Sequence, residues 1–432
     1  MFTKQSIIKH TKILLALLIF HFIITTFIRF QLWVDFWLEF LNTAIVNLWK
    51  EVYLAFIYFL IIGYAVKNKK VFKANTILIF FIILFVVSIL ISLLNWFNIK
   101  ALILGIKYDF WILLPVVMYQ LIDFDENDKK NFYNFFLKLI KITIVLSLFF
   151  EIIRFVSPKI LYLIWYWPLG DWIPWQKPPM YFETWFYWIR RFSWIFSGPN
   201  HMAFYFVAFW PLILLSIFYR RLHFIWWILY LILLIWTLSR SGAIAFVWQI
   251  ILIALFIFIY NKNLRRKILF IVDFLALMAW IWWVYLYLTW KYHQIILRGS
   301  STKWHITKSL ESLEKIKENL FIWHWLWTAW PATHYTKTDV IPESWFLQIF
   351  YELWFVWWLL WFAFLLLVVR NLYLTWNKKF MKNIDIMKVS LSIWVIWLLI
   401  QGLVLHSFED SMISLPLFML IWIFLSWLDN KN

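Results

Sequence analysis

The chain has 432 residues, of which 65% are hydrophobic and 14% are charged, and its mean hydropathy is +0.78. A water-soluble domain of this length could not bury so much apolar surface. Runs of about 18 to 25 apolar residues recur along the chain, and each is long enough to cross a bilayer. The composition therefore predicts an all-α, polytopic transmembrane protein.

The formal net charge is +18. In a soluble protein this excess would suggest a nucleic-acid partner. Here most of it lies in short segments between apolar runs, as is typical of cytoplasmic loops beside anionic headgroups. We therefore expect membrane lipids and no nucleic acid as partners, while a polyanionic lipid-linked substrate is also compatible. Cysteine is absent, which excludes disulfides and thiolate metal sites.

We expect one membrane domain over residues 1–432 with about twelve spans. The first apolar run lacks a small-residue cleavage site, so we expect it to be a retained span and not a removed signal peptide. The expected spans are 11–29, 48–66, 74–95, 101–122, 133–156, 200–219, 223–239, 242–260, 267–289, 343–369, 387–405 and 411–428.

Every even-numbered connection is short and rich in lysine or arginine. This alternation predicts that both termini are cytoplasmic and that the odd-numbered connections face outward from the cytoplasmic membrane. Two outward connections are long: a first outer loop at 157–199, and a large extracytoplasmic loop at 290–342 between spans nine and ten.

The segment 290–358 is the longest polar interruption in the chain. Ordering a long loop costs conformational entropy, which favours a functional role for it. Within it, Thr302–Asn319 is expected to be helical, because Ile306, Leu310, Leu313 and Ile316 fall at helical spacing. We expect the functional site in this loop and the spans to hold it.

The first candidate group lies at the outer entrance to span six. Arg190 and Arg191 could hold phosphate oxygens through paired N–H bonds. The turn Gly198-Pro199-Asn200 follows, with Asn200 as a possible helix cap. The alternative reading is that both arginines anchor the chain at the interface by snorkelling.

The second group is the tight outer turn Thr237–Gly242 between spans seven and eight. Arg240 runs against the charge bias there, and a costly charge at a membrane helix usually marks function. The third group is Arg298 with Ser300, Ser301 and Lys303, where a guanidinium beside hydroxyls suits a diphosphate. The alternatives are a snorkelling Arg240 and a solvated loop charge at Arg298.

The fourth group surrounds the start of span ten. Glu343 opens that span, where the helix dipole favours a carboxylate, and from there it could accept a proton from a hydroxyl. Ser344, His324 and His334 are candidate substrate contacts. The alternatives are a first-turn glutamate without chemistry and two ordinary surface histidines, whose spacing fits no short metal motif.

No P-loop is present, and Asp123-Phe124-Asp125 matches an Asp-x-Asp signature without other site residues beside it in sequence. We therefore expect no metal and no cofactor.

Tryptophan occurs 36 times and glycine only 7 times, whereas average usage predicts about 30 glycines. Many tryptophans stand where glycine is expected: Trp323-His324-Trp325-Leu326-Trp327 becomes Gly-His-Gly-Leu-Gly when tryptophan is read as glycine. We therefore hypothesise that the gene reads UGA as glycine. The alternative is a tryptophan-rich membrane protein with interfacial aromatic belts.

Taken together, these groups resemble the O-antigen ligase/polymerase family of bacterial membrane glycosyltransferases, over residues 185–370 by motif and over the whole chain by topology. The matching pieces are Arg191-x-x-Trp194-x-Phe196-x-x-Pro199-Asn200, the Ser239-Arg240 turn, Arg298, the Trp323–Trp327 segment read as glycines, and Glu343-Ser344-x-Phe346-Leu347-Gln348-x-x-x-Glu352. Each motif alone is weak, and their order around a long outer loop makes the resemblance fairly specific.

The resemblance implies a GT-C-like fold that transfers a glycan from a polyprenyl diphosphate carrier to an acceptor hydroxyl on a lipid or glycan. It implies that Arg191, Arg240 and Arg298 neutralise the diphosphate and that Glu343 acts as the base. Ligases of the family carry histidine before the tenth span, so Glu343 favours a polymerase or another acceptor. The competing hypothesis is a lipid-linked glycan transporter or another non-enzymatic membrane protein.

Overall fold

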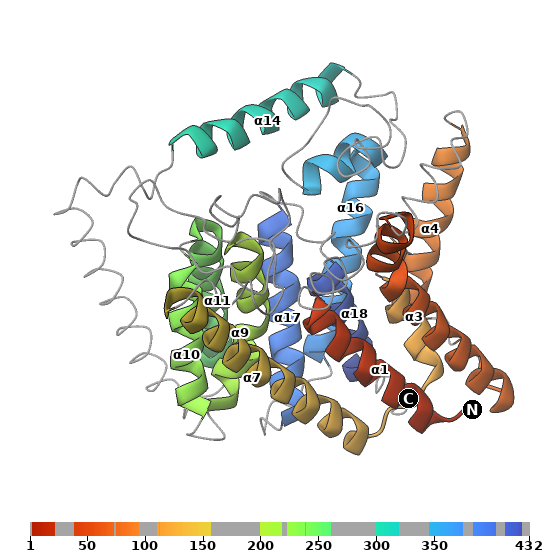
Figure 1. The fold of residues 1–432 in the computed structure, drawn as a ribbon. Coiled ribbons are helices and arrows are strands. Elements are labelled where there is room, and N and C mark those ends of the chain that lie inside the picture. The colour runs from red at the N-terminus through yellow and green to blue at the C-terminus, as the bar shows by residue number, and fades with distance from the viewer. Residues whose placement is uncertain are drawn as a thin grey trace.

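The computed structural model describes ten stretches of the chain: 2–21, 39–72, 75–94, 110–156 without 112, 199–217, 223–260 without 238, 299–318, 345–374, 383–402 and 411–425. These stretches contain twelve α-helices and one 3-10 helix, and no strand occurs within them, which confirms the all-α expectation for this part (Figure 1). The helices are α1 (Lys4–Ile19), α3 (Glu39–Lys67), α4 (Thr76–Leu94), α6 (Leu114–Met118), α7 (Glu126–Val156), α9 (Pro199–Ile217), α10 (His223–Trp236), α11 (Arg240–Tyr260), α14 (Gly299–Glu318), α16 (Trp345–Leu374), α17 (Asn383–Gly402) and α18 (Ser411–Leu425).

Most expected spans coincide with helices to within a few residues. Span 133–156 lies in α7, span 223–239 matches α10, and span 242–260 matches α11. The first helix begins at Lys4, earlier than expected, because Thr3 caps it by accepting a hydrogen bond from the Ser6 N–H. Span 267–289 lies outside the described residues. The continuous apolar runs thus predicted the helices well.

The expected span 101–122 is wrong as a single helix over its described part. The chain turns at Phe110–Leu113, forms the short helix α6, and tightens into the 3-10 helix η3 (Tyr119–Leu121). Pro115 stands in the first turn of α6. Proline has no N–H to donate and its ring clashes with the preceding turn, so it starts a helix and does not continue one.

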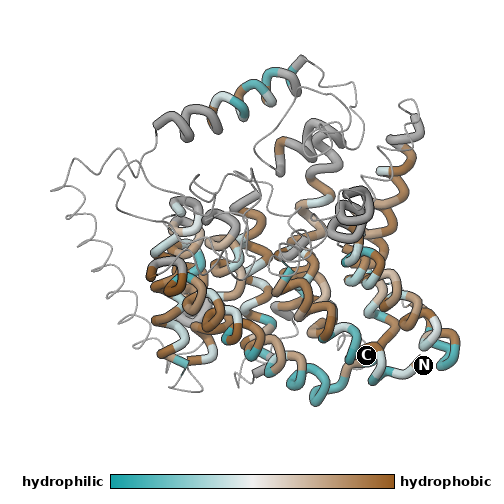
Figure 2. Tube along the Cα trace, in the orientation of Figure 1, coloured by the Kyte–Doolittle hydropathy of each residue, from teal (hydrophilic) through white to brown (hydrophobic). Residues whose placement is uncertain are grey.

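Hydrophobic residues dominate most helices of the bundle (Figure 2), and their side chains include both fully buried and exposed ones. α9 lies at the centre and is buried along Met202–Leu215, where it packs against α7, α10, α11 and α17. On α4, by contrast, Ile79, Ile82, Val86 and Leu90 form an exposed apolar face. Within the described part of the chain, only Leu48–Lys67 is a helix both long and apolar enough to cross a membrane, and six shorter apolar helices accompany it.

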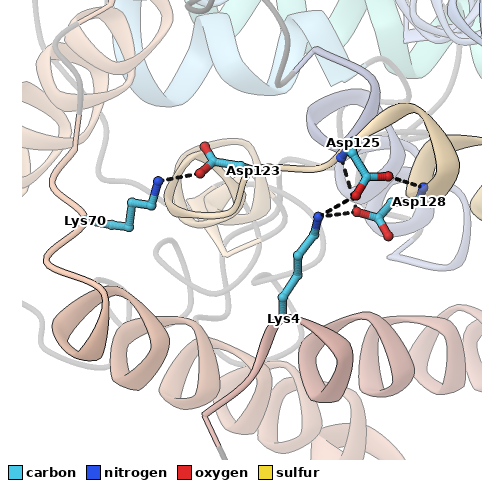
Figure 3. Close-up of polar contacts among 5 residues, drawn as sticks. All are labelled: Lys4, Lys70, Asp123, Asp125 and Asp128. Atoms are coloured by element: carbon cyan, nitrogen blue, oxygen red, sulfur yellow. Dashed lines mark hydrogen bonds and ion pairs between the residues drawn. The ribbon is translucent and has the colours of Figure 1, made fainter.

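Charged residues tie three distant segments together at one end of the bundle (Figure 3). Lys4 Nζ lies 3.0 Å from Asp125 Oδ2 and 2.5 Å from Asp128 Oδ2, and Lys70 forms an ion pair with Asp123. We call the end of the bundle where this five-residue cluster lies the basic end, after the lysine-rich connections that the cluster joins. It brings the start of α1 and the second and fourth expected connections to one side of the bundle.

Two aspartates also start α7 at this end. The Asp128 N–H donates to Asp125 Oδ1 at 2.9 Å, and the Asp125 N–H donates to Asp128 Oδ2 at 3.1 Å. This reciprocal cap satisfies two donors of the first helical turn. The Asp128 N–H and the Lys4 ammonium lower the pKa of Asp125 to about 2.

Contacts along α7 fix the direction of α9. Phe136 packs against Phe209, with ring centroids 5.3 Å apart, whereas Thr143, farther along α7, contacts the Tyr205 hydroxyl at 3.3 Å, nearer the start of α9. The two helices therefore run in opposite directions. Because α7 starts at the basic end, α9 starts at the opposite end of the bundle.

Candidate functional site

The start of α11 is built by local hydroxyl caps. The Gly242 N–H donates to Ser239 Oγ at 3.3 Å, and the Ser239 N–H donates to Thr237 Oγ1 at the same distance. Ser239 is therefore the N-cap of α11, a role that serine favours because its oxygen satisfies an otherwise unpaired helix donor. Both hydroxyl residues are buried. This capped turn places Arg240 as the first residue of the helix.

Gly242 lets the start of α11 press against the start of α9. A Cβ built on Gly242 would come within 2.7 Å of Ala203 Cβ, closer than real side chains approach. The connections from α9 to α10 and from α10 to α11 are short and α10 packs along α9, so α10 runs back along α9 and α11 runs in the same direction as α9. We call the paired helix starts, Pro199–Ala203 and Thr237–Gly242, the α9–α11 corner.

The α9–α11 corner joins two of the groups singled out in the sequence. Arg240 is the first residue of α11 and Asn200 is the second residue of α9. The prediction that Asn200 caps the helix is wrong, because α9 already begins at Pro199, whose missing N–H suits a first helical position. The remaining predicted site residues lie outside the described residues: Arg190, Arg191, Arg298, His324, His334, Glu343 and Ser344.

The helix predicted in the large loop is present as α14, which begins at Gly299, directly after Arg298 in sequence. α14 packs against α16 and lies crosswise to the bundle, beyond the ends of α16 and α17 (Figure 1). Of the predicted apolar stripe, Ile306, Leu310 and Leu313 are exposed.

The direction of α16 follows from its connection to α17. α17 packs against α7, and Lys388 near the start of α17 is close enough to Lys129 in the first turn of α7 to lower the pKa of that lysine. Only eight residues separate the end of α16 from the start of α17. The start of α16, which follows Glu343 and Ser344 in sequence, therefore points away from the basic end.

The arrangement of the α9–α11 corner suits an anion. Two parallel helices direct their positive dipole ends to one place. Ser239 already accepts from the Gly242 N–H and Pro199 has no N–H, so the helix dipoles and the arginine carry the attraction for an anion. Arginine is the only charged residue type that the described starts of these two helices carry, at position 240. Helix starts with arginine form ready sites for phosphate or carboxylate oxygens.

The structure also contains a chain of hydrogen bonds that we did not predict. Ser216 donates its hydroxyl proton to the Ile213 carbonyl at 2.7 Å, so His223 Nδ1 donates to Ser216 Oγ, also at 2.7 Å. His223 Nε2 is then left to accept from Lys141 Nζ at 3.0 Å. This chain of hydrogen bonds joins the end of α9 and the start of α10 to α7. In the sequence, only a histidine at the start of an apolar run could have indicated it.

A second unpredicted feature is the burial of Lys129 near the basic end. Its exposed fraction is 3%, and burial together with the nearby Lys388 charge lowers the pKa of Lys129 to about 8. A lysine cluster in a short connection is expected to be solvated, so the sequence did not indicate this burial.

Comparison with known proteins adds no relative to this description. No family model, no curated protein and no solved structure matches the chain.

Proposed function

We propose that this chain is a polytopic glycosyltransferase of the cytoplasmic membrane, similar to O-antigen ligases and polysaccharide polymerases. In this proposal it transfers a glycan from a polyprenyl diphosphate to an acceptor hydroxyl on the outer face. The observation that carries the proposal is the α9–α11 corner. It brings the Pro199-Asn200 and Ser239-Arg240 motifs, about 40 residues apart in sequence, to neighbouring helix starts at the end remote from the lysine-rich connections.

In the proposed reaction, the acceptor oxygen attacks the anomeric carbon of the lipid-linked sugar. The bond between that carbon and the phosphate oxygen breaks, and the polyprenyl diphosphate leaves with the electron pair. Arg240, Arg298 and Arg191 stabilise the negative charge that grows on the leaving group. Glu343 accepts the hydroxyl proton of the acceptor. No nucleotide sugar, metal or cofactor takes part.

The membrane setting is supported by the outside of the bundle. Exposed apolar faces occur on α3, α4, α7, α10 and α11. Hydrocarbon tails would cover such faces, which a water-soluble monomer rarely exposes to this extent. In the proposed orientation the basic end is cytoplasmic, so the α9–α11 corner and α14 lie on the outer side.

A transporter of lipid-linked glycans is the second candidate. Glu151 on α7 and Gln249 on α11 are buried within helices that we place in the membrane. Polar groups at such depth often line a transport path. A transporter requires two compartments, however, whereas a transferase does not.

The discriminating experiment uses purified full-length protein in detergent, with a polyprenyl diphosphate-linked oligosaccharide and a soluble acceptor analogue. The proposal predicts that polyprenyl diphosphate is released and that the glycan becomes linked to the acceptor without any gradient. Substrate binding without turnover, together with movement of the lipid-linked glycan across proteoliposomes, would favour the transporter instead.

A further inference from the structure

We infer that most positions written as tryptophan in this sequence hold glycine in the protein that its own cell makes, because the cell reads UGA codons as glycine. This inference concerns the identity of the residues and is independent of the proposed function. Composition first suggests it, and the packing of the helices supports it separately.

Seven indoles have a buried N–H without the hydrogen bond that tryptophan normally finds. Among the described residues, their Nε1 atoms are inaccessible to solvent and have no acceptor; they belong to Trp49, Trp111, Trp210, Trp227, Trp394, Trp397 and Trp422. A buried tryptophan usually places its N–H on a partner, and an unpaired buried donor is destabilising in protein and in lipid alike. One such group can be tolerated, and its repetition at seven indoles adds to the signal from composition.

These positions lie where small residues are expected. Trp394 and Trp397 face the centre of the bundle, where their rings meet Phe209 and Phe204 of α9. α16 carries tryptophans at 354 and 358, four residues apart, and again at 357 and 361. Glycine at this spacing lets membrane helices approach closely, whereas paired indoles hold them apart.

Two residues that are written as glycine occupy this kind of position. Gly242 contacts Ala203 so closely that a Cβ would not fit, and Gly63 is covered by the ring of Phe2. The chain thus uses glycine where elements touch, yet it has only 7 glycines in 432 residues. Reading all 36 tryptophans as glycine raises the 7 glycines to 43, so the usual share of about 7%, or about 30 residues, is reached when most but not all of the tryptophans are glycine.

The tryptophans also do not follow the distribution that true membrane tryptophans favour. Interfacial belts would concentrate them near the ends of spans. Instead Trp210, Trp361 and Trp397 lie well inside their helices and are almost completely buried. The belt explanation therefore does not account for the positions that contribute most to the bundle core.

The direct test is the codon at each of these seven positions, together with peptide masses from protein purified from its own cells. We expect in-frame UGA codons and peptides that carry glycine at 394 and 397. UGG codons, or peptides that carry tryptophan there, would overturn the inference.

A matched pair of variants tests the packing argument in a chain that is expressed with tryptophan at these positions, from a gene written with UGG codons. Trp397 and Leu398 are adjacent on α17 and both are fully buried. We expect W397G to increase the yield of monodisperse full-length protein at least twofold and L398G to decrease it. If W397G lowers the yield as much as L398G does, the indole belongs to the core and the inference fails.

Discussion

Gly242 and Ala203 meet at the α9–α11 corner with no room for a methyl group between them, since a Cβ on Gly242 would lie 2.7 Å from Ala203 Cβ. This contact sets the separation of the two helix starts that carry Asn200 and Arg240. Any change that widens it is expected to move Arg240 relative to α9 and so to disturb the proposed diphosphate site.

We expect Gly242→Ala to destabilise the protein by about 1–3 kcal/mol, because the added methyl overfills a packed contact. Glycine-to-alanine changes within helices otherwise stabilise by up to about 1 kcal/mol. A decrease in the free energy of unfolding would therefore indicate that the added methyl meets the packed contact. Thermal unfolding in detergent measures the effect. Ala203→Gly in the same chain should restore most of the loss, and a double variant no more stable than Gly242→Ala alone would show that another contact is responsible.

The absence of cysteine allows the proposed topology to be mapped with single introduced thiols. Lys69 and Lys130 are exposed near the basic end, and Leu310 is exposed on α14. We expect Lys69→Cys and Lys130→Cys to react with an impermeant maleimide only after the cells are opened, and Leu310→Cys to react in intact cells. Labelling of all three from the same side would exclude the orientation on which the outer-face site depends.

Lys129 is expected to destabilise the folded chain at neutral pH. Burial and the Lys388 charge lower its pKa in the folded state to about 8, below the usual value of 10.5. The unfolded chain therefore binds more protons between these two values, so stability should rise with pH across that window. Below pH 8, Lys129→Met should stabilise the protein by about 1–3 kcal/mol.

The neighbouring Lys130 is exposed and provides the control for this prediction. Lys130→Met should change the free energy of unfolding by less than about 0.5 kcal/mol at any pH. The gain from Lys129→Met should also disappear above pH 10.5, where both states have lost the proton. A pH-independent gain would indicate better packing of methionine and not the removal of a buried charge.

The type of cation matters for the proposed site as well as its charge. Arginine offers a planar fork that binds two phosphate oxygens, and lysine offers a single point charge. We expect Arg240→Lys to recover only a small part of the activity lost in Arg240→Ala. Transfer rates at saturating donor provide the measurement, and Lys4→Ala at the basic end is the control that should leave those rates unchanged. Full recovery with lysine would mean that position 240 supplies charge without bidentate geometry.

The sequence predicted helices better than it predicted their contacts. Long apolar runs identified α7, α10 and α11 because hydrophobic length is a local property. The break before Pro115 was missed, although proline is a known local signal, because the apolar run continued through it.

The site was predictable only in part for a related reason. The Ser239-Arg240 turn is a local motif, and it lies between α10 and α11, where Ser239 caps α11. Its contact with α9 depends on Gly242 facing Ala203, a pairing of residues 39 positions apart that no local pattern encodes. The burial of Lys129 and the Lys141–His223 bond likewise arise from tertiary packing.

The central claim is that arginines at the outer helix starts support glycan transfer from a lipid diphosphate. The most direct measurement is the rate of polyprenyl diphosphate release by purified wild-type protein, Arg240→Ala and Arg298→Ala, at equal amounts of folded protein. We expect wild-type release to depend on the acceptor and each alanine variant to lose at least about 100-fold in rate. Full activity in both variants would contradict the proposed site, and no release by wild-type protein would contradict the proposed reaction.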